Sequence, residues 1–167
     1  MANTFTLIEA QTLTTTTASI TFSSIPATFT DLCLVFSVRG SAADNGATIR
    51  FNGSASNLSA RNIFGDGASA TSNTSSGSIF IYGGQNSTSW TANTFNNAQA
   101  YIPNYAGSNY KSVSVDAVNE NNGTDAYMSF TAGLWSDASA ITSVTILPGS
   151  GSFVQYSSAY LYGIKNS

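Results

Sequence analysis

The residues best suited to acid–base chemistry are five carboxylates outside the expected strands: Asp44, Asp66, Glu120, Asp125 and Asp137. Two suitably spaced carboxylates can hydrolyse a glycosidic bond without any other titratable group. Each of these five, however, lies in or beside a turn rich in Gly, Asn or Ser, where Asp commonly accepts hydrogen bonds from nearby backbone. The sequence also has no histidine, the side chain whose ordinary pKa lies closest to neutrality. We therefore expect these carboxylates to stabilise turns, and we predict no catalytic residue.

The tryptophans do not complete a hydrolytic site. A glycosidase acid needs a partly desolvated pocket, usually with an aromatic ring that stacks on the sugar. Trp90 and Trp135 are the only two tryptophans, and neither adjoins a carboxylate in a way that predicts a paired site. The sequence therefore favours a protein that is not an enzyme.

The best candidate for a metal site is the oxygen-rich turn at 119–125, Asn-Glu-Asn-Asn-Gly-Thr-Asp. Calcium prefers crowded carboxylate and amide oxygens. The turn lacks the regularly spaced acids of an EF-hand loop, and Asn-Asn-Gly alone also predicts a hairpin turn. We assign no metal ligand, and we leave open whether this turn holds an ion. Gly65-Asp66-Gly67 is too short for a phosphate loop and precedes no expected helix, so we predict no cofactor.

The single cysteine, Cys33, cannot form a disulfide within the chain. It lies in the apolar run 32–36, Leu-Cys-Leu-Val-Phe, which predicts a small buried hydrophobic side chain. A catalytic thiolate needs a cationic neighbour that lowers its pKa, and no histidine is present to provide one.

The basic residues are few and scattered along the chain: Arg39, Arg50, Arg61, Lys111 and Lys165. With a formal net charge of −3, they form no basic stripe, so we expect no nucleic-acid partner. The first residues show neither the positive segment nor the long apolar segment of a secretory signal. The longest apolar runs have four or five residues, too few to span a membrane. We therefore expect synthesis in a cytoplasm and no membrane partner.

Alternation of apolar and polar residues with a period of two dominates the chain. Over 112–117, Val, Val and Ala alternate with Ser, Ser and Asp. Over 127–134, the set Met128, Phe130, Ala132 and Leu134 alternates with the set Tyr127, Ser129, Thr131 and Gly133. Each pattern predicts a strand whose more apolar set faces the core.

Ten strands are expected in all, over residues 5–10, 19–23, 32–39, 47–52, 78–82, 94–102, 112–117, 127–134, 141–147 and 153–164. Turn sequences such as Asn52-Gly53 lie between them, and no window of eleven residues shows a helical apolar stripe. Short strands at this spacing predict an all-β fold, an antiparallel β-sandwich that forms a single domain over residues 1–167. A jelly roll of two four-stranded sheets suits this length.

Three segments depart from the simple pattern. Residues 65–77 contain almost nothing apolar, which predicts a long exposed loop. Residues 1–17 are rich in threonine and predict either an edge strand or an extended arm that could pair with another subunit. The strand at 153–164 has apolar side chains on both faces, so it is either central to the sandwich, which we favour, or covered by another subunit.

Six segments carry a resemblance to known proteins: 22–32, 49–53, 100–107, 132–135, 140–144 and 159–165. Examples are Ile-Arg-Phe-Asn-Gly at 49–53, Ala-Gly-Leu-Trp at 132–135 and Ala-Tyr-Leu-Tyr-Gly-Ile-Lys at 159–165. Through these segments the chain resembles a family of small virion structural proteins of tailed bacteriophages from environmental and marine sources. The resemblance implies a jelly-roll virion component and no catalytic residue.

Within that family, the expected role is capsid decoration. Such a cement protein stabilises the head by binding the lattice of the major capsid protein on the outer capsid surface, typically as a homotrimer. Symmetry then multiplies weak contacts into high avidity. The alternative is a tail or head appendage that binds host-surface glycan through tyrosines, of which the chain has eight, and through the segment 65–77.

Overall fold

The computed structural model describes residues 4–123 and 126–165, and in this part of the chain it contains strands and no helix. The strands are β1 (Phe5–Thr12), β2 (Ile20–Phe22), β3 (Asp31–Ser37), β4 (Ala47–Phe51), β5 (Leu58–Gly65), β6 (Ala70–Ser76), β7 (Ile79–Ile81), β8 (Asn97–Ile102), β9 (Lys111–Asn119), β10 (Tyr127–Trp135), β11 (Val144–Pro148) and β12 (Ser158–Ile164). A search of the same residues finds no helix of the length and hydropathy needed to cross a membrane.

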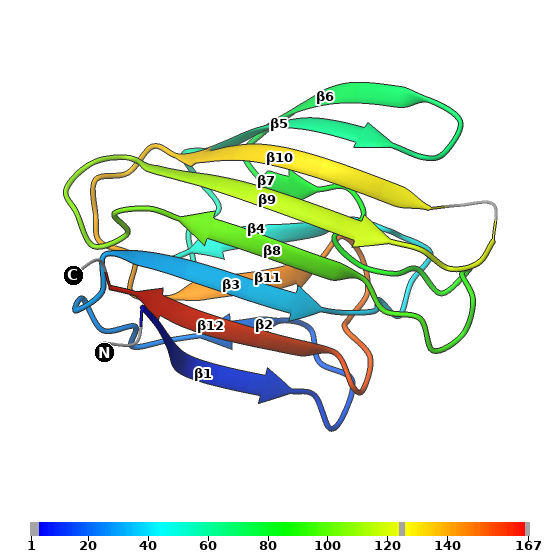
Figure 1. Cartoon of the computed structure of the whole chain (residues 1–167), viewed down its shortest axis with the longest axis horizontal. Coiled ribbons are helices and arrows are strands. Elements are labelled where there is room, and N and C mark those ends of the chain that lie inside the picture. The colour runs from blue at the N-terminus through cyan, green and yellow to red at the C-terminus, as the bar shows by residue number, and fades with distance from the viewer. Residues whose placement is uncertain (1–3, 124–125, 166–167) are drawn as a thin grey trace.

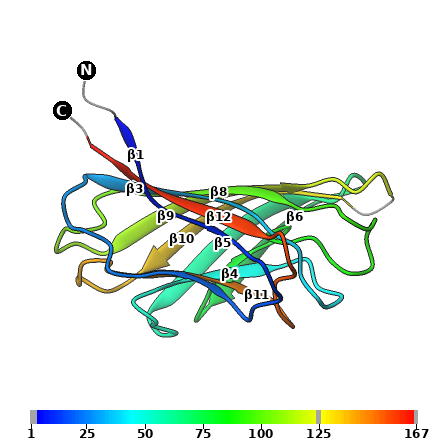
Figure 2. The ribbon, with the colours of Figure 1, turned by 90° about the horizontal axis from the view of Figure 1, so that it is seen from below.

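The strands form two sheets that pack face to face (Figure 1). The large sheet has eight strands in the order β1-β12-β3-β8-β9-β10-β5-β6, and the small sheet has four in the order β2-β11-β4-β7. All neighbouring strands are antiparallel. The prediction of an all-β antiparallel sandwich is confirmed. Two sheets of four strands were expected, but one sheet is twice as wide as the other, and Figure 2 shows the two layers from the side.

The two additional strands are β5 and β6, which the sequence pattern does not reveal. In β5, Asn62 is buried while its neighbour Ile63 is exposed, so the apolar alternation of the strand is interrupted. In β6, the residues are Ser, Thr, Asn and Ala, and nearly all are exposed. The prediction of a loop over 65–77 is therefore wrong in part. Residues Ala70–Ser76 pair with β5 and form an exposed edge strand, because backbone pairing with β5 needs no apolar side chain.

The opposite edge of the large sheet is β1, so the segment 1–17 contributes an edge strand. The neighbouring strand β12 lies between β1 and β3, inside the sheet. Its side chains Ala159 and Leu161 belong to the core, while Tyr160 and Tyr162 lie half-buried on the outer face. Both faces of β12 are thus partly covered within one chain.

The core lies between the sheets and takes large side chains from both. The side chains of Leu32, Leu34 and Phe36 from β3 and of Ile49 and Phe51 from β4 belong to this core, and all are fully buried. Removal of this much apolar surface from water is the main stabilising term, at about 25 cal/mol per Å².

Gly133 of β10 is packed against Val113 of the neighbouring strand β9 and against Ile79 of β7 in the small sheet. A Cβ atom added to Gly133 would lie 2.7 Å from Val113 Cγ1 and 2.9 Å from Ile79 Cγ2. Real Cβ contacts are longer than this, so any other residue at this position would force Val113 or Ile79 to shift.

We therefore expect Gly133→Val to lower the free energy of unfolding by about 1–3 kcal/mol, because the added methyl groups overpack the space between the sheets. The matched control is Ala132→Val, one residue earlier on the exposed face, which should change stability by no more than about 0.5 kcal/mol. Urea denaturation of both variants gives the measurement. Equal destabilisation of the two would contradict the close approach of β10 and β7.

Candidate functional site

The carboxylates singled out in the sequence bind their own turns. Four of them accept a backbone N–H one to three residues further along the chain: Asp44 from Gly46 (2.7 Å), Asp66 from Ala68 (2.9 Å) and Ser69 (2.7 Å), Glu120 from Asn121 (3.0 Å) and Asn122 (2.7 Å), and Asp137 from Ser139 (2.7 Å). The expectation that they stabilise turns is confirmed for these four. Asp125 lies outside the described residues.

The structure does not bring these carboxylates together. Each of the three main cavities has one acidic residue in its lining: Glu120, Asp44 or Asp116. In the described part of the chain, no three His, Cys, Asp or Glu side chains lie close enough to share a metal ion. In the 119–125 turn, Asn119 Oδ1 accepts the N–H of Tyr127 (2.8 Å), and Glu120 Oε1 accepts two N–H groups. These oxygens thus already have protein donors.

Cys33 is buried, as the apolar run predicted, but it lies on the outer face of the large sheet rather than between the sheets. Its cross-strand neighbours there are Tyr101 and Tyr162. Burial raises the pKa of the Cys33 thiol, and the nearby Asp116 carboxylate raises it further. The thiol is therefore protonated at neutral pH.

The orientation of β10 is opposite to the expected one. The register pairs Ala117 with Ser129, Val115 with Thr131, and Val113 with Gly133. Cross-strand partners share a face of the sheet, and the side chains of β9 in these pairs belong to the core. The more polar set of β10 must therefore face inward. The prediction that Met128, Phe130, Ala132 and Leu134 form the core face of this strand is wrong, and all four are exposed.

The inward polar side chains of β10 have hydrogen-bond partners. Ser129 Oγ donates to the carbonyl of Tyr82 (2.6 Å), and the hydroxyl of Thr131 donates to Asn62 Oδ1. A buried hydroxyl that has a partner avoids most of its desolvation penalty. These hydrogen bonds make a polar inner face of β10 tolerable.

Two outward side chains of β10, Met128 and Phe130, form a continuous apolar surface with Ile63 of β5 and Val118 of β9. We call this surface the outer patch: Ile63, Val118, Met128 and Phe130. Their exposed fractions are 65%, 43%, 70% and 58%. Met128 lies directly opposite Val118, and Phe130 lies directly opposite Ile63. The alternation of 127–134 groups Met128 and Phe130 on one face of the strand, but that face was assigned to the core. Ile63 and Val118 were missed because single apolar residues carry no signal of exposure.

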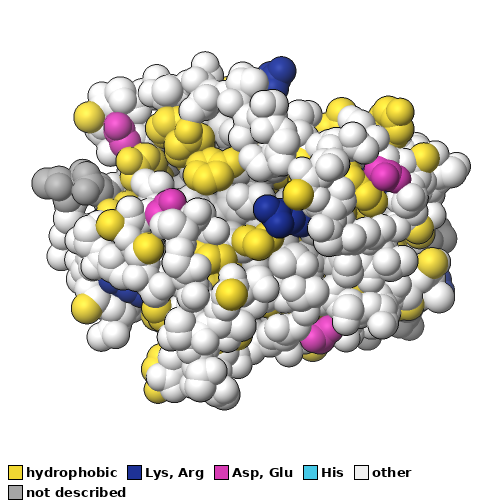
Figure 3. Space-filling view, turned by 180° about the vertical axis from the view of Figure 1, so that it is seen from behind, with side chains coloured by type: hydrophobic (Ala, Val, Ile, Leu, Met, Phe, Trp, Pro, Cys, Tyr) yellow, Lys and Arg dark blue, Asp and Glu magenta, His cyan; other side chains and the backbone are white. Residues whose placement is uncertain are grey.

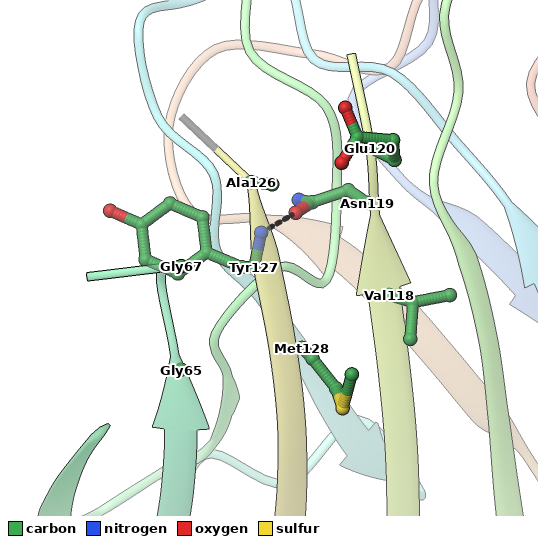
Figure 4. A pocket seen from close by; sticks show the side chains of 8 residues that line it. All are labelled: Gly65, Gly67, Val118, Asn119, Glu120, Ala126, Tyr127 and Met128. Atoms are coloured by element: carbon green, nitrogen blue, oxygen red, sulfur yellow. Dashed lines mark hydrogen bonds between the residues drawn. The ribbon is translucent and has the colours of Figure 1, made fainter. Parts of the chain in front are cut away.

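Two adjoining cavities follow the outer patch, with volumes of about 340 and 410 Å³. They share Gly65, Val118 and Met128, so they form one groove beside the turn that joins β5 to β6. Figure 4 shows the side chains of Val118 and Met128 on the same side of their strands, while the Tyr127 ring points away from them. Asp116, directly opposite Phe130, and Glu120 add carboxylates to the lining of this groove.

On the other side of β10, Tyr127 belongs to a row of aromatic rings outside the main core cluster. We call it the aromatic row, and its members in order are Trp90, Tyr127, Phe64, Tyr82 and Phe80. Successive ring centroids lie 5.9, 6.0, 4.2 and 5.0 Å apart. Trp90 and Tyr127 are nearly parallel, with an interplanar angle of 9°.

Arg39 positions the loop that carries Trp90. Its guanidinium donates to the carbonyls of Trp90 (3.1 Å), Thr91 (2.9 Å) and Thr94 (3.0 Å). Guanidinium presents several donors in a fixed planar arrangement, so one side chain can gather three carbonyls. The hydroxyl of Thr91 also donates to the carbonyl of Asn121, which ties this loop to the β9–β10 turn.

Comparison of the chain with models of protein families, with curated proteins and with solved structures finds no match.

The free energy of unfolding should be nearly constant from about pH 5 to 8 and should fall below about pH 4, since the chain has no histidine and its shifted carboxylates titrate in acid. Backbone hydrogen bonds from Ser69 and Ser139 lower the pKa of Asp66 and Asp137 respectively. A carboxyl group whose pKa is lower in the folded state stabilises the folded protein at pH values above its pKa in the unfolded chain. That stability is lost as the pH falls through the folded pKa.

Urea unfolding at stepwise pH measures this profile. The double variant Asp66→Asn, Asp137→Asn should show a shallower decline in acid, since the amide oxygen still accepts the hydrogen bond but does not titrate. A steep change of stability between pH 5 and 8 would contradict the assignment.

Proposed function

We propose that this chain is a non-enzymatic structural protein of a tailed-phage virion, which decorates the outer capsid surface by binding the major capsid protein through its outer patch. The observation that carries the proposal is the orientation of β10, which places Met128 and Phe130 in solvent although the strand has an inward face available. A contiguous exposed apolar surface on a soluble domain is typical of a protein–protein interface.

The composition of the surface supports protein docking. Interfaces commonly have an apolar centre and a polar rim. Here the apolar side chains of the outer patch are bordered by Asp116 on β9, Glu120 beyond it and Arg61 on β5, all of them exposed. The patch also lies on three adjacent hydrogen-bonded strands, so it changes little in shape on binding and little ordering entropy is lost.

We further propose that the sandwich is a jelly roll with two inserted hairpins. The strands β1-β12-β3-β8 and β2-β11-β4-β7 form two sets of four, and successive strands such as β1 and β2, β3 and β4, and β11 and β12 alternate between the sets. Such alternation between two sheets is what a double Greek key produces. The remaining strands, β9, β10, β5 and β6, then extend one edge of the large sheet. This architecture agrees with the resemblance to phage virion proteins.

We propose that the chain associates with itself through its other edge. Phe5 and Leu7 of β1 have exposed fractions of 56% and 50%, and Phe5 contacts the ring of Tyr162 edge-on. An edge strand with exposed apolar side chains and free backbone groups favours pairing with another copy. A homotrimer formed in this way would leave the outer patch, at the far end of the sheet, free for the lattice.

Purified protein added to undecorated, expanded heads should saturate at a copy number fixed by the lattice and should raise the temperature at which the heads rupture. The double variant Met128→Ser, Phe130→Ser should lose about 2 kcal/mol or more of binding free energy, as is usual when the centre of an interface is removed. Bound copies are counted by gel densitometry and by cryo-electron microscopy.

The control is Leu134→Ser, on the same face of β10 but outside the groove, which should bind heads as the wild type does. Thermal unfolding of the free protein verifies that both variants fold. If the double variant decorates heads normally, the outer patch is not the docking surface. Binding to host cells without binding to heads would instead favour an appendage.

Light scattering of the purified protein at micromolar concentration should give a mass three times that of the 17.3 kDa chain. Leu7→Lys should shift the protein toward monomer, because a charge in an apolar interface must be desolvated. Thr6→Lys, on an exposed residue of the same strand, is the matched control. A wild-type monomer in solution and on the virion would contradict the proposed self-association.

A further inference from the structure

A second surface lies on the opposite side of β10 from the outer patch, where the aromatic row reaches a polar cavity. Seen from behind the large sheet, hydrophobic side chains gather toward the end that carries the β5–β6 hairpin, with acidic side chains beside them (Figure 3). All rings of the row except Trp90 are only half-buried, and Trp90 is 9% exposed. Four of the five rings therefore present part of their surface to solvent, while Trp90 is buried at one end of the row.

The polar cavity has a volume of about 350 Å³. We call it the polar cup, and its lining includes Asp44, Asn45, Ser87, Ser89, Trp90 and Tyr127. A carboxylate, an amide and two hydroxyls thus surround the end of the aromatic row. This volume lies near the lower limit for small-molecule sites, about 300–1,000 Å³.

Several polar groups of the cup are available to a ligand. Asp44 Oδ1 accepts the N–H of Gly46, whereas Asp44 Oδ2 and the side-chain amide of Asn45 have no hydrogen-bond partner in the described part of the chain. The hydroxyls of Ser87 and Ser89 bond to each other at 2.8 Å, which leaves one of the two protons free to donate elsewhere. The cup therefore offers both donors and acceptors.

These groups match the chemistry of a sugar. A pyranose presents C–H groups on a ring face, which the electron-rich face of an aromatic ring attracts. It also presents hydroxyls around its rim that both donate and accept hydrogen bonds. A purely apolar ligand would leave the carboxylate and amide of Asp44 and Asn45 desolvated without partners. The lining residues of the cup include no lysine or arginine, and Asp44 repels anions, so sulfated sugars, uronates and nucleic acids are disfavoured.

We propose that the polar cup binds one neutral hexose unit of a glycan and that the aromatic row carries the adjoining units. The site is held in place before the ligand arrives. Arg39 fixes the loop of Trp90, and Asn119 Oδ1 holds the backbone of Tyr127 at 2.8 Å. Such preorganisation reduces the entropy lost on binding. This site opens on the other side of β10 from the outer patch, although Tyr127 lines both the cup and the groove beside the patch. The proposal does not rest on the decoration function.

The test uses affinity electrophoresis of the full chain through gels that contain dextran, mannan or galactomannan, with dextran sulfate as the anionic counterpart. We expect at least one neutral polysaccharide to retard the protein, and dextran sulfate not to. Titration with the oligosaccharides of that polysaccharide should shift the emission of Trp90. Affinity should rise from the monosaccharide to the trisaccharide as the aromatic row becomes occupied.

Two variants locate the site. Asp44→Asn keeps the acceptor for Gly46 but replaces the free carboxylate oxygen, and Trp90→Leu removes a ring while retaining apolar volume; each should weaken binding about tenfold or more. The control Asp116→Asn removes the same charge from the outer face and should bind as the wild type does. Trp135, buried at the other end of β10, provides fluorescence that confirms folding of the Trp90 variant.

The proposal is overturned if no neutral polysaccharide retards the protein, if only dextran sulfate does, or if Asp44→Asn binds as tightly as Asp116→Asn. Head binding of the same variants separates the two functions. Glycan binding lost with decoration unchanged supports two independent surfaces, whereas loss of both in a folded Asp44→Asn variant would show that the cup is not a separate site.

Discussion

The register between β9 and β10 determines what the large sheet presents to solvent. Because Val113, Val115 and Ala117 occupy the core, their partners on β10 must share that inner face, and these partners are Gly133, Thr131 and Ser129. A shift of one residue would turn every side chain of β10 over. It would bury Met128 and Phe130, but it would also put a side chain in the place of Gly133, where a Cβ atom would lie only 2.7 Å from Val113 Cγ1. Ser129 and Thr131 would then lose their hydrogen bonds to Tyr82 and Asn62. The observed register keeps the interior of the sandwich filled and leaves apolar surface outside.

The exposed apolar surface is concentrated on the strands that make the large sheet wider than the small one, β9, β10, β5 and β6. The outer patch comes from β5, β9 and β10, and the aromatic row takes Phe64 from β5 and Tyr127 from β10. The small sheet, with four strands, cannot cover a sheet of eight, and its edge strand β7 contacts β10, β5 and β6. The pair of hairpins therefore extends beyond most of the core. In a β-sandwich such an extension is where new surfaces can be added without repacking the interior.

Local sequence signals predicted the local features well. The turn carboxylates, the strand at 112–117 and the buried Cys33 all follow from residues close in sequence. The orientation of β10 did not, because an amphipathic strand shows that two faces differ but not which one the rest of the chain covers. The role of Arg39 was also missed, because its carbonyl partners lie more than fifty residues further along the chain. Strand β6 has no apolar pattern at all, and only its pairing with β5 makes it a strand.

The alternation of a β-strand also explains how one short segment can serve two surfaces. Met128 belongs to the outer patch and Tyr127 to the aromatic row, although they are adjacent in the chain, because successive side chains point to opposite faces. A partner seated on the outer patch therefore leaves most of the aromatic row open, although Tyr127 also lines the groove beside the patch. The two surfaces still share one backbone, and the 119–125 turn is tied to the loop of Trp90 through Thr91. Side-chain substitutions can thus separate the two surfaces, whereas any change that moves the start of β10 must alter both.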